Sequence, residues 1–383
     1  MHIAIYETVH FENIATLLRL FDTNGNRITV FCDEQAYSLA AVNIPHPKKF
    51  TWILRNSATS RRQFVRQLFS QFKNDTPDIF YINTLSDNFI SLTRLLRRYP
   101  QVRSIATLHA LNAYFSPQLK FNLRRIVRVA GKWILRRTIK EYSIQSSVLL
   151  PAARKWMDPR IPIHVVPGAV YLPHALYEST LQPLHLVVPG SVDERRRNYE
   201  QLNAWLLQVD KKKIALKITF LGATASEFGK HMLQIWQSLK LINIKLHYFD
   251  TDMVPQETYN QVLEEADFIF NPSVVETVLE DGAVEIYGQT VNSGVFADAI
   301  RYAKPLIIPA AIQIDPILHP CSFRYDQLND ISDLLQSIHT DPKRYLNWIH
   351  AAQESAEHFT VEQIRYKNPE LFLHGPSVTR HGN

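Results

Sequence analysis

The sequence predicts an α/β protein with two domains, each built on a sheet of parallel strands. A chain of 383 residues is longer than one compact core usually holds, so we expect two domains of roughly 150 to 200 residues. Short apolar runs alternate with amphipathic stretches along the chain, as strands alternate with crossover helices in a parallel sheet. Residues 266–309 contain the clearest strand–turn–helix–strand unit.

Composition narrows the class of protein. Apolar residues make up 46% and charged residues 20% of the chain, as in ordinary globular proteins. With 11 glycines the chain has few candidates for Gly-rich phosphate loops, so anion binding must rely on helix starts and basic side chains. The only cysteines, Cys32 and Cys321, match no metal or disulfide spacing, which suits a reducing compartment. No charged-then-apolar leader precedes residues 2–6 and no apolar stretch approaches the length of a membrane span, so we expect a cytosolic protein.

Charge is divided unevenly between the two halves. Residues 1–170 carry 24 Lys and Arg against 10 Asp and Glu, a net charge of +14. The remaining residues carry 18 bases and 26 acids, a net charge of −8. This asymmetry predicts that the first half meets an anionic surface or polymer.

The first half alternates between strands and helices in the order expected of a parallel sheet. Apolar runs predict strands at residues 3–6, 28–32, 78–83, 103–109, 142–145 and 163–168. Helical spacing predicts helices at residues 11–21, 60–72 and 89–99. His10 and Glu12 follow the first strand, where they either line a binding site or are ordinary solvated loop residues.

A strongly basic helix is predicted at residues 121–140, which contain seven bases and no acid. Apolar residues such as Trp133 lie largely away from the basic ones on this helix. One interpretation is a surface that contacts anionic lipid headgroups at the inner face of a membrane. The other is a solvated helix whose apolar side lies in the domain core, and nucleic acid is the weakest option because no nucleic-acid motif accompanies the charge. The basic stripe recurs every four residues: Arg124, Arg128, Lys132, Arg136 and Lys140.

A proline-containing linker at residues 171–183 separates the domain at 1–170 from a second domain at 184–360. Strands are predicted at residues 185–190, 218–222, 244–249, 268–270 and 306–308, and helices at 257–265, after Ser293, and at 328–338 and 342–356. A C-terminal segment at 361–383 crosses back to the first domain and ends in a loose tail from residue 375.

Two short motifs flank the helix that begins after Ser293. Residues 271–276 read Asn-Pro-Ser-x-x-Glu and end with Glu276. Residues 298–307 begin with Asp298 and close with Lys-Pro-Leu-Ile. These motifs resemble the nucleotide-sugar site of GT-B fold glycosyltransferases, particularly those related to glycosyltransferase family 4. The resemblance implies two Rossmann-like domains facing across a cleft. It also implies transfer of a hexosyl group from a UDP or GDP sugar to a glycan or lipid-linked acceptor, as in surface polysaccharide synthesis.

The resemblance implies roles for single residues. Glu276 would contact the donor sugar and Asp298 would hold the ribose, while His109 matches a strand-end histidine that donates a hydrogen bond near the donor sugar. His109, His10 or Glu12 would act as general base if the enzyme inverts. Arg197 with the following Asn matches a pair that binds the diphosphate without a metal ion. The residues expected to bind the donor are Gly190, Arg195, Arg196, Arg197, Phe249, Val254, Pro272, Ser293, Gly294, Val295 and Asp298.

The sequence departs from the family pattern at several places. An insertion separates Glu276 from Asp298, Ser191 stands in place of an Arg, and residues 7–13 replace the usual Gly-rich loop. Two alternatives therefore stay open: a UDP-sugar 2-epimerase of similar fold, and a non-catalytic protein that binds glycan or scaffolds a partner. The sequence also predicts that Arg197→Ala lowers turnover far more than stability.

Overall fold

The computed structural model describes residues 1–116, 123–173, 181, 183–279 and 282–372, which form two compact units. One unit holds residues 1–168 together with the segment that begins at Val361, and the other holds most of the residues between them. Most of the predicted linker and the tail from residue 375 lie outside the described residues. No helix in the described part of the chain has both the length and the apolar character that crossing a bilayer requires.

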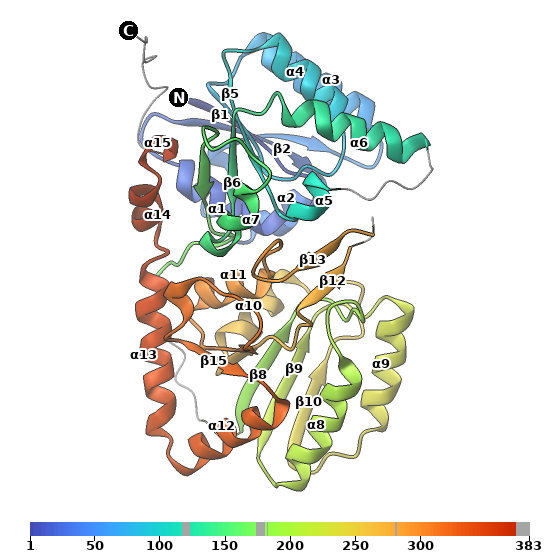
Figure 1. The fold of residues 1–383 in the computed structure, drawn as a ribbon, viewed down its shortest axis with the longest axis vertical. Coiled ribbons are helices and arrows are strands. Elements are labelled where there is room, and N and C mark those ends of the chain that lie inside the picture. Colours follow the sequence, from blue (N-terminus) through green and yellow to red (C-terminus); the bar gives the residue numbers. More distant parts are fainter. Residues whose placement is uncertain (117–122, 174–180, 182, 280–281, 373–383) are drawn as a thin grey trace. The chain divides into compact units, whose positions relative to one another are not determined.

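The first unit is built on a seven-stranded parallel sheet in the order β3-β2-β1-β4-β5-β6-β7. Helices α3, α4 and α6 lie together over one face of this sheet (Figure 1). The strands are β1 (His2–Tyr6), β2 (Arg27–Asp33), β3 (Thr51–Arg55), β4 (Ile79–Ile82), β5 (Arg103–Thr107), β6 (Glu141–Ile144) and β7 (Ile163–Val165). The helices are α1 (Phe11–Phe21), α2 (Glu34–Ala41), α3 (Arg61–Asn74), α4 (Phe89–Arg98), α5 (Leu111–Phe115), α6 (Leu123–Arg136), α7 (Leu150–Arg154), α14 (Val361–Lys367) and α15 (Pro369–Phe372), with 3₁₀ turns at Pro47–Lys49 and Ser147–Leu149.

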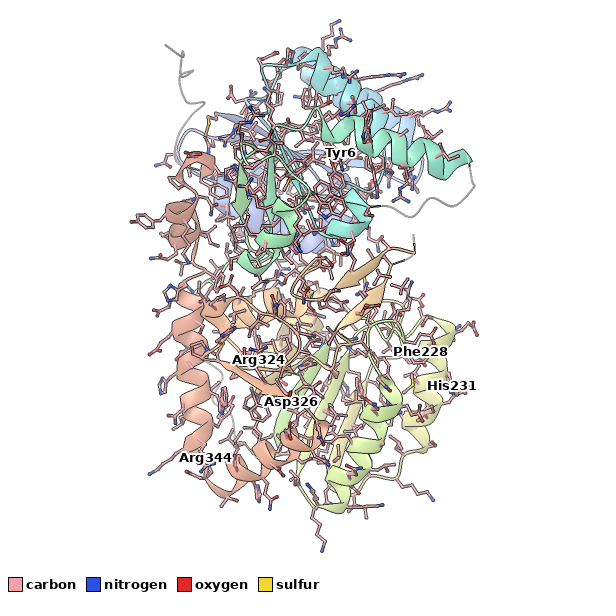
Figure 2. The ribbon with its side chains drawn as sticks, viewed as in Figure 1. Tyr6, Phe228, His231, Arg324, Asp326 and Arg344 are labelled. Carbon is pink, nitrogen blue, oxygen red and sulfur yellow. The ribbon has the colours of Figure 1, made fainter. Side chains whose placement is uncertain are left out.

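Aromatic side chains fill the core of the first unit. Tyr6 on β1 is buried inside this unit (Figure 2), and its ring lies 6.1 Å from that of Phe64 on α3, measured between centroids. The C-terminal segment also packs here, because Arg365 on α14 donates hydrogen bonds to the backbone carbonyls of Arg19 at 2.8 Å and Leu20 at 3.0 Å. These carbonyls lie in the last turn of α1, where they lack partners within the helix.

The predicted basic stripe on α6 contacts the interior of its own unit. Lys132 is buried, and its Nζ donates to the carbonyl of Ala113 at 2.9 Å. Arg128 donates to the carbonyl of Ser86 at 2.9 Å, and the side chain of Arg124 lies outside the described residues. Gly131 allows this close packing, since a Cβ there would lie 3.0 Å from that of Phe89 on α4. Two further stripe members also make contacts within the unit: Arg136 over the ring of Phe115, and Lys140 with the carbonyl of Pro100.

Apolar residues occupy part of the exposed side of α6 instead. Ile126, Val127 and Trp133 are each between 45% and 48% exposed. The guanidinium of Arg137 lies 3.3 Å from the centroid of the Trp133 ring. Of the two interpretations of this helix, the one with its apolar side in the core does not hold for Ile126 and Trp133. The one with a lipid-facing basic stripe does not hold for Lys132, which is buried. The four-residue spacing gave the stripe but could not show which side of α6 faces α4.

The second unit is built on a six-stranded parallel sheet in the order β10-β9-β8-β11-β14-β15. Its core is aromatic, with Trp205 on α8 lying 5.7 Å from Phe270 between ring centroids, while His231 and Arg344 lie on its surface (Figure 2). The strands are β8 (Leu184–Pro189), β9 (Leu216–Leu221), β10 (Ile244–Tyr248), β11 (Phe268–Phe270), β14 (Leu306–Pro309) and β15 (Ser322–Tyr325). The helices are α8 (Tyr199–Lys211), α9 (Glu227–Ser238), α10 (Gln256–Glu264), α11 (Gly294–Tyr302), α12 (Leu328–Thr340) and α13 (Lys343–Glu357), with a 3₁₀ turn at Pro316–Leu318.

The insertion between Glu276 and Asp298 contains an antiparallel hairpin. Its strands are β12 (Glu276–Val278) and β13 (Val284–Ile286), and they pair only with each other in the described residues. Burial alternates along both strands, so Thr277 and its partner Glu285 are buried while Glu276 is exposed. The predicted fold class, two Rossmann-like α/β domains, is confirmed by these two parallel sheets.

Candidate active site

The order of strands in each sheet indicates where a ligand binds. In the first sheet β1 lies between β2 and β4. The chain passes from β1 to β2 on one side and from β4 to β5 on the other, so the connections after β1 and β4 run in opposite directions. In the second sheet β8 lies between β9 and β11 in the same way. Ligands of open α/β sheets bind at such switch points, beyond the carboxyl ends of the strands. The sequence-predicted residues of both units lie beyond the carboxyl ends of strands in these sheets, in the loops or on the elements that follow them.

In the first unit the structure brings His10 and His109 together. His10 is the N-cap residue of α1 and His109 follows β5, and their ring centroids are 4.3 Å apart. Glu12 lies in the first turn of α1 and is partly buried. The two histidines therefore form one candidate site, with Glu12 on the adjoining helix.

His109 is held as a neutral imidazole. Its Nε2 lies 2.7 Å from the carbonyl oxygen of Asn83, which can only accept, so Nε2 carries the proton and donates it. Burial, with a smaller contribution from His10, lowers the pKa of His109 to about 3, against the opposing effect of the Asn83 carbonyl. Nδ1 is consequently a hydrogen-bond acceptor. The sequence predicted that His109 donates to a sugar hydroxyl, whereas this tautomer suits acceptance from one.

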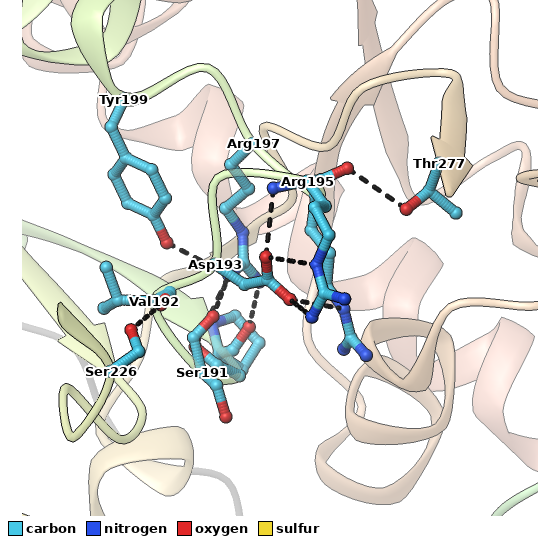
Figure 3. A network of polar contacts seen from close by, with 11 residues as sticks. Ser191, Val192, Asp193, Arg195, Arg197, Tyr199, Ser226 and Thr277 are labelled. Atoms are coloured by element: carbon cyan, nitrogen blue, oxygen red, sulfur yellow. Dashed lines mark hydrogen bonds and ion pairs between the residues drawn. The ribbon is translucent and has the colours of Figure 1, made fainter. Parts of the chain in front are cut away.

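In the second unit, the loop after β8 carries the predicted arginines (Figure 3). Arg197 is 5% exposed, and its guanidinium donates to the carbonyls of Pro189 and Ser191, the latter at 2.9 Å, and to Tyr199 Oη at 3.3 Å. Gly190 turns the loop with a φ of +98°, and a Cβ there would lie 3.3 Å from Arg197 Nη2. Arg197 therefore holds the loop in shape.

The neighbouring arginines extend further into solvent. Arg195 and Arg196 have side chains 46% and 52% exposed. Both pair with Asp193, Arg195 through Nη2 at 2.8 Å and Arg196 through Nε at 3.6 Å. Hydrogen bonds from Arg195 are the main reason that the pKa of Asp193 is lowered, although burial opposes them. Arg195 and Arg196 are thus the cations of this loop that a solvent-borne phosphate reaches most directly.

The arginine loop is joined to the segment that follows β11. Arg197 forms a β-bridge with Ser273, and the N–H of Val274 donates to the carbonyl of Arg196 at 2.9 Å. Thr277 Oγ1 donates to the carbonyl of Arg195 at 3.1 Å (Figure 3). Two segments predicted from separate motifs therefore meet at the switch point. Glu276 lies on this joined segment, exposed to solvent.

Helix α11 begins at the same edge of the second sheet. Ser293 is its N-cap residue, and its Oγ accepts from the N–H of Val295 at 3.4 Å. Gly294 faces open space, since a Cβ there would meet no atom within 4 Å. Asp298 is 8% exposed, and its Oδ2 accepts from Tyr259 Oη on α10 at 2.9 Å. The start of α11 is therefore accessible to an anion, with Asp298 oriented by a tyrosine.

The remaining predicted donor-binding residues lie near the same edge. Pro272 is buried directly after β11, and Val254 is buried in the loop after β10. The carbonyl of Phe249, in that same loop, accepts from Thr224 Oγ1 at 2.8 Å. No three His, Cys, Asp or Glu side chains in the described residues are grouped closely enough to hold a metal ion.

Sequence patterns missed three polar residues at the two switch points. Glu7 and Asn83 follow β1 and β4 and are both buried. Asn271 follows β11 and is fully buried, and within the described residues its Nδ2 has no hydrogen-bond partner. Each directly follows a buried apolar strand, and a polar residue at that position was the signal that could have identified it.

The comparison with protein families finds one match. Residues 13–172, which make up most of the first unit, match the model of glycosyltransferase family 4. Over these residues the chain is similar to glycosyltransferase family 4. The family match falls in the first half, whereas the motifs noticed in the sequence lie in the second. No curated protein matches the chain.

Solved structures with the same fold cover nearly the whole chain. Sucrose-phosphate synthase from Thermosynechococcus elongatus has a TM-score of 0.64 at 14% identity, covering 97% of this chain and 98% of that one. A glycosyltransferase from Rickettsia africae has a TM-score of 0.59 at 12% identity, covering 97% of both chains. UDP-GlcNAc 2-epimerase from Neisseria meningitidis, bound to UDP-GlcNAc, has a TM-score of 0.55 at 10% identity, covering 97% and 100%. At these identities the structures establish the GT-B fold.

Proposed function

We propose that the chain is a glycosyltransferase that moves a hexosyl group from a nucleoside-diphosphate sugar, of UDP or GDP type, to a hydroxyl of a glycan or lipid-linked acceptor. One observation carries this: the arginine loop and the segment after β11 are bonded together at the switch point of the second sheet. Helix α11 starts at the same edge, so basic side chains and the amino end of a helix are available to one diphosphate.

The reaction breaks the bond between the anomeric carbon and the diphosphate oxygen, and the acceptor oxygen forms the new bond to that carbon. Negative charge grows on the leaving diphosphate, and Arg195 and Arg196 with the start of α11 stabilise it electrostatically, in place of a metal ion. Asp298, oriented by Tyr259, accepts hydrogen bonds from the ribose hydroxyls. Glu276 binds the donor sugar.

The first unit supplies the hydroxyl-binding part of this mechanism. The neutral imidazole of His109 accepts a hydrogen bond at Nδ1, either from a hydroxyl of the donor sugar or from the acceptor. In an inverting reaction His10 or Glu12 takes the proton that the acceptor hydroxyl loses, because a pKa of about 3 makes His109 a weak base that only orients this hydroxyl. In a retaining reaction His109 orients the sugar and the proton leaves by another route.

A thermal-shift screen of UDP, GDP, CMP and dTDP sugars tests the donor, followed by transfer from the best ligand to polysaccharide and lipid-linked acceptors. We expect one nucleotide class to raise Tm, because a ligand that binds only the folded state stabilises it. The matched control is Asp333→Ala, which removes an exposed acid on α12 far along the chain from the loop. If no nucleotide stabilises the protein, the non-catalytic glycan-binding or scaffolding alternative is favoured.

A UDP-sugar 2-epimerase is the second candidate, because epimerase structures share this fold over 97% or more of the chain. An epimerase needs no separate acceptor. Incubating the protein with a UDP sugar alone, and following the configuration at C2 by NMR, separates the two functions. Epimerised sugar without an acceptor supports the second candidate.

The acceptor-side unit is proposed to work in the cytoplasm, at an anionic membrane surface. The net charge of +14 in residues 1–170 and the exposed Ile126, Val127 and Trp133 on α6 support this. An apolar patch flanked by basic residues binds at the headgroup region of a bilayer. This position would present a lipid-linked acceptor of surface polysaccharide synthesis to the enzyme.

A further inference from the structure

Glu7, which directly follows β1, is fully buried and accepts four hydrogen bonds. Its Oε1 accepts from the backbone N–H of Val9 at 2.5 Å and of His10 at 2.8 Å. Its Oε2 accepts from Thr84 Oγ1 at 2.7 Å and from Asn83 Nδ2. All four partners can act as donors, and a carboxylate accepts from all of them. A glutamine would place an NH₂ group in the position of one oxygen. The hydrogen bonds from Asn83 and Thr84 to Oε2 could then not both be kept without rearrangement.

The Glu7 carboxylate fills the position at which this loop would otherwise bind an anion. The amides of Val9 and His10 directly precede α1, and backbone amides in a loop that leads into a helix commonly bind phosphate. Here both already donate to Glu7. A phosphate would have to displace this buried carboxylate or lie beside it, and like charges in a buried site repel strongly.

The same carboxylate connects to both histidines of the candidate site. It holds His10 through the backbone N–H of that residue. It reaches His109 through Asn83. The side-chain Nδ2 of Asn83 donates to Glu7, and the backbone carbonyl of Asn83 accepts from His109 Nε2. Asn83 is fixed on its other side, because its Oδ1 accepts from Thr107 Oγ1 at 3.1 Å. Glu7 therefore sets where both rings lie.

We propose that Glu7 is the positioning residue of the first unit. Its carboxylate holds the His10–His109 pair so that His109 Nδ1 accepts from a hydroxyl, and it closes the start of α1 to phosphate. This inference rests on the proposed function, in which the hydroxyl belongs to a sugar donor or acceptor and the diphosphate is bound by the second unit alone.

The test compares Glu7→Gln with Glu141→Gln. Glu141 is a mostly buried carboxylate at the amino end of β6, whereas Glu7 follows the carboxyl end of β1. Glu141 pairs with Arg103 at 2.5 Å and His164 at 2.7 Å, so its substitution controls for lost stability. We expect Glu7→Gln to lower kcat by about 10²-fold, as expected when a reacting group is misplaced. Its affinity for UDP and GDP by calorimetry should stay within about twofold of wild type. Glu141→Gln should keep the wild-type kcat.

Either of two results, one in turnover and one in nucleotide binding, would overturn the proposal. One is an unchanged kcat in folded Glu7→Gln. The other is a loss of nucleotide affinity as large as the loss of kcat/KM, which would place the diphosphate at this loop.

A second measurement needs no turnover and separates this inference from the proposed function. Two-dimensional ¹H–¹⁵N NMR of the histidine rings reports which nitrogen is protonated. We expect His109 to be a single Nε2–H tautomer near pH 7 in wild type and Glu141→Gln, and a mixture in Glu7→Gln. Identical His109 signals in all three proteins would reject the positioning role, even if no sugar transfer is found.

Discussion

The imidazole of His109 lies against the imidazole of His10, with the two ring centroids 4.3 Å apart. The rings come from loops after β5 and β1, and two protonated imidazoles this close would repel each other. Burial and the neighbouring His10 lower the pKa of His109 to about 3, so His109 stays neutral near pH 7. This relationship fixes what the site can do with a hydroxyl.

Replacing His109 with Ala tests its contact with the sugar or acceptor. The change removes the Nδ1 acceptor, so we expect kcat/KM for transfer to fall by about 10²-fold or more, as for loss of a positioned acid–base group. Binding of UDP or GDP should stay unchanged, because these ligands lack the sugar. His164→Ala is the control, since His164 is a buried histidine that pairs with Glu141. A variant at His109 with full activity would remove it from the site.

The lowered pKa of His109 predicts a pH dependence of stability. Above its unfolded pKa near 6.5 the imidazole is neutral in both states and contributes nothing. As pH falls from 6.5 toward 3, the unfolded chain takes up a proton that the folded state resists, so the free energy of unfolding falls. At pH 4.5, two units below the unfolded pKa, this costs about 3 kcal/mol. Urea unfolding of His109→Gln should therefore show a smaller loss of stability between pH 7.5 and 4.5 than wild type. Equal losses would contradict the lowered pKa.

Arg196→Ala and Arg197→Ala should separate binding from folding. Arg196 is half exposed, so we expect its removal to weaken UDP or GDP binding about tenfold with little change in Tm. Arg197 is buried among backbone carbonyls, so its removal should lower the free energy of unfolding by about 3 kcal/mol. The sequence pattern predicts the reverse for Arg197, with turnover lost far more than stability. Calorimetry and urea unfolding of both variants decide between the two.

Sequence reasoning located the sheets well because buried parallel strands are short apolar runs. The strand at residues 268–270 and the helix at 11–21 have the bounds that were predicted. It missed β3 (Thr51–Arg55), an edge strand that begins with an exposed residue. It also missed the hairpin β12–β13, whose strands of three residues each are too short to stand out from a loop.

Side-chain roles were harder to predict than elements. Motif spacing placed Arg197 in the arginine loop but could not show that its guanidinium turns inward to three backbone carbonyls. The pairing of Glu7 with Asn83 joins residues 76 positions apart, which no local pattern records. Local propensity predicts where loops lie, whereas the partner of a buried charge depends on strands that meet only in the fold.

Asp298→Asn tests the proposed ribose contact. The change keeps the side-chain size but replaces one acceptor oxygen with a donor, so we expect affinity for UDP and GDP to fall about tenfold. Tyr259→Phe removes the hydroxyl that donates to Asp298 at 2.9 Å and should have a smaller effect of the same sign. Calorimetry measures both. Unchanged affinity in Asp298→Asn would take Asp298 out of the nucleotide site.

Trp133→Ser tests the membrane surface proposed on α6. The Trp133 side chain is 48% exposed beside Arg137, and its burial in a bilayer interface supplies about 2 kcal/mol. We expect its loss to weaken binding to vesicles of anionic phosphatidylglycerol by more than tenfold in flotation assays. Trp156→Ser is the matched control, because Trp156 is 45% exposed in the same unit but follows α7 and stacks on Phe115. Binding to anionic vesicles should also weaken as salt increases, since the Debye length shortens. Equal losses in both variants, or no binding by wild type, would show that α6 is not a membrane-binding surface.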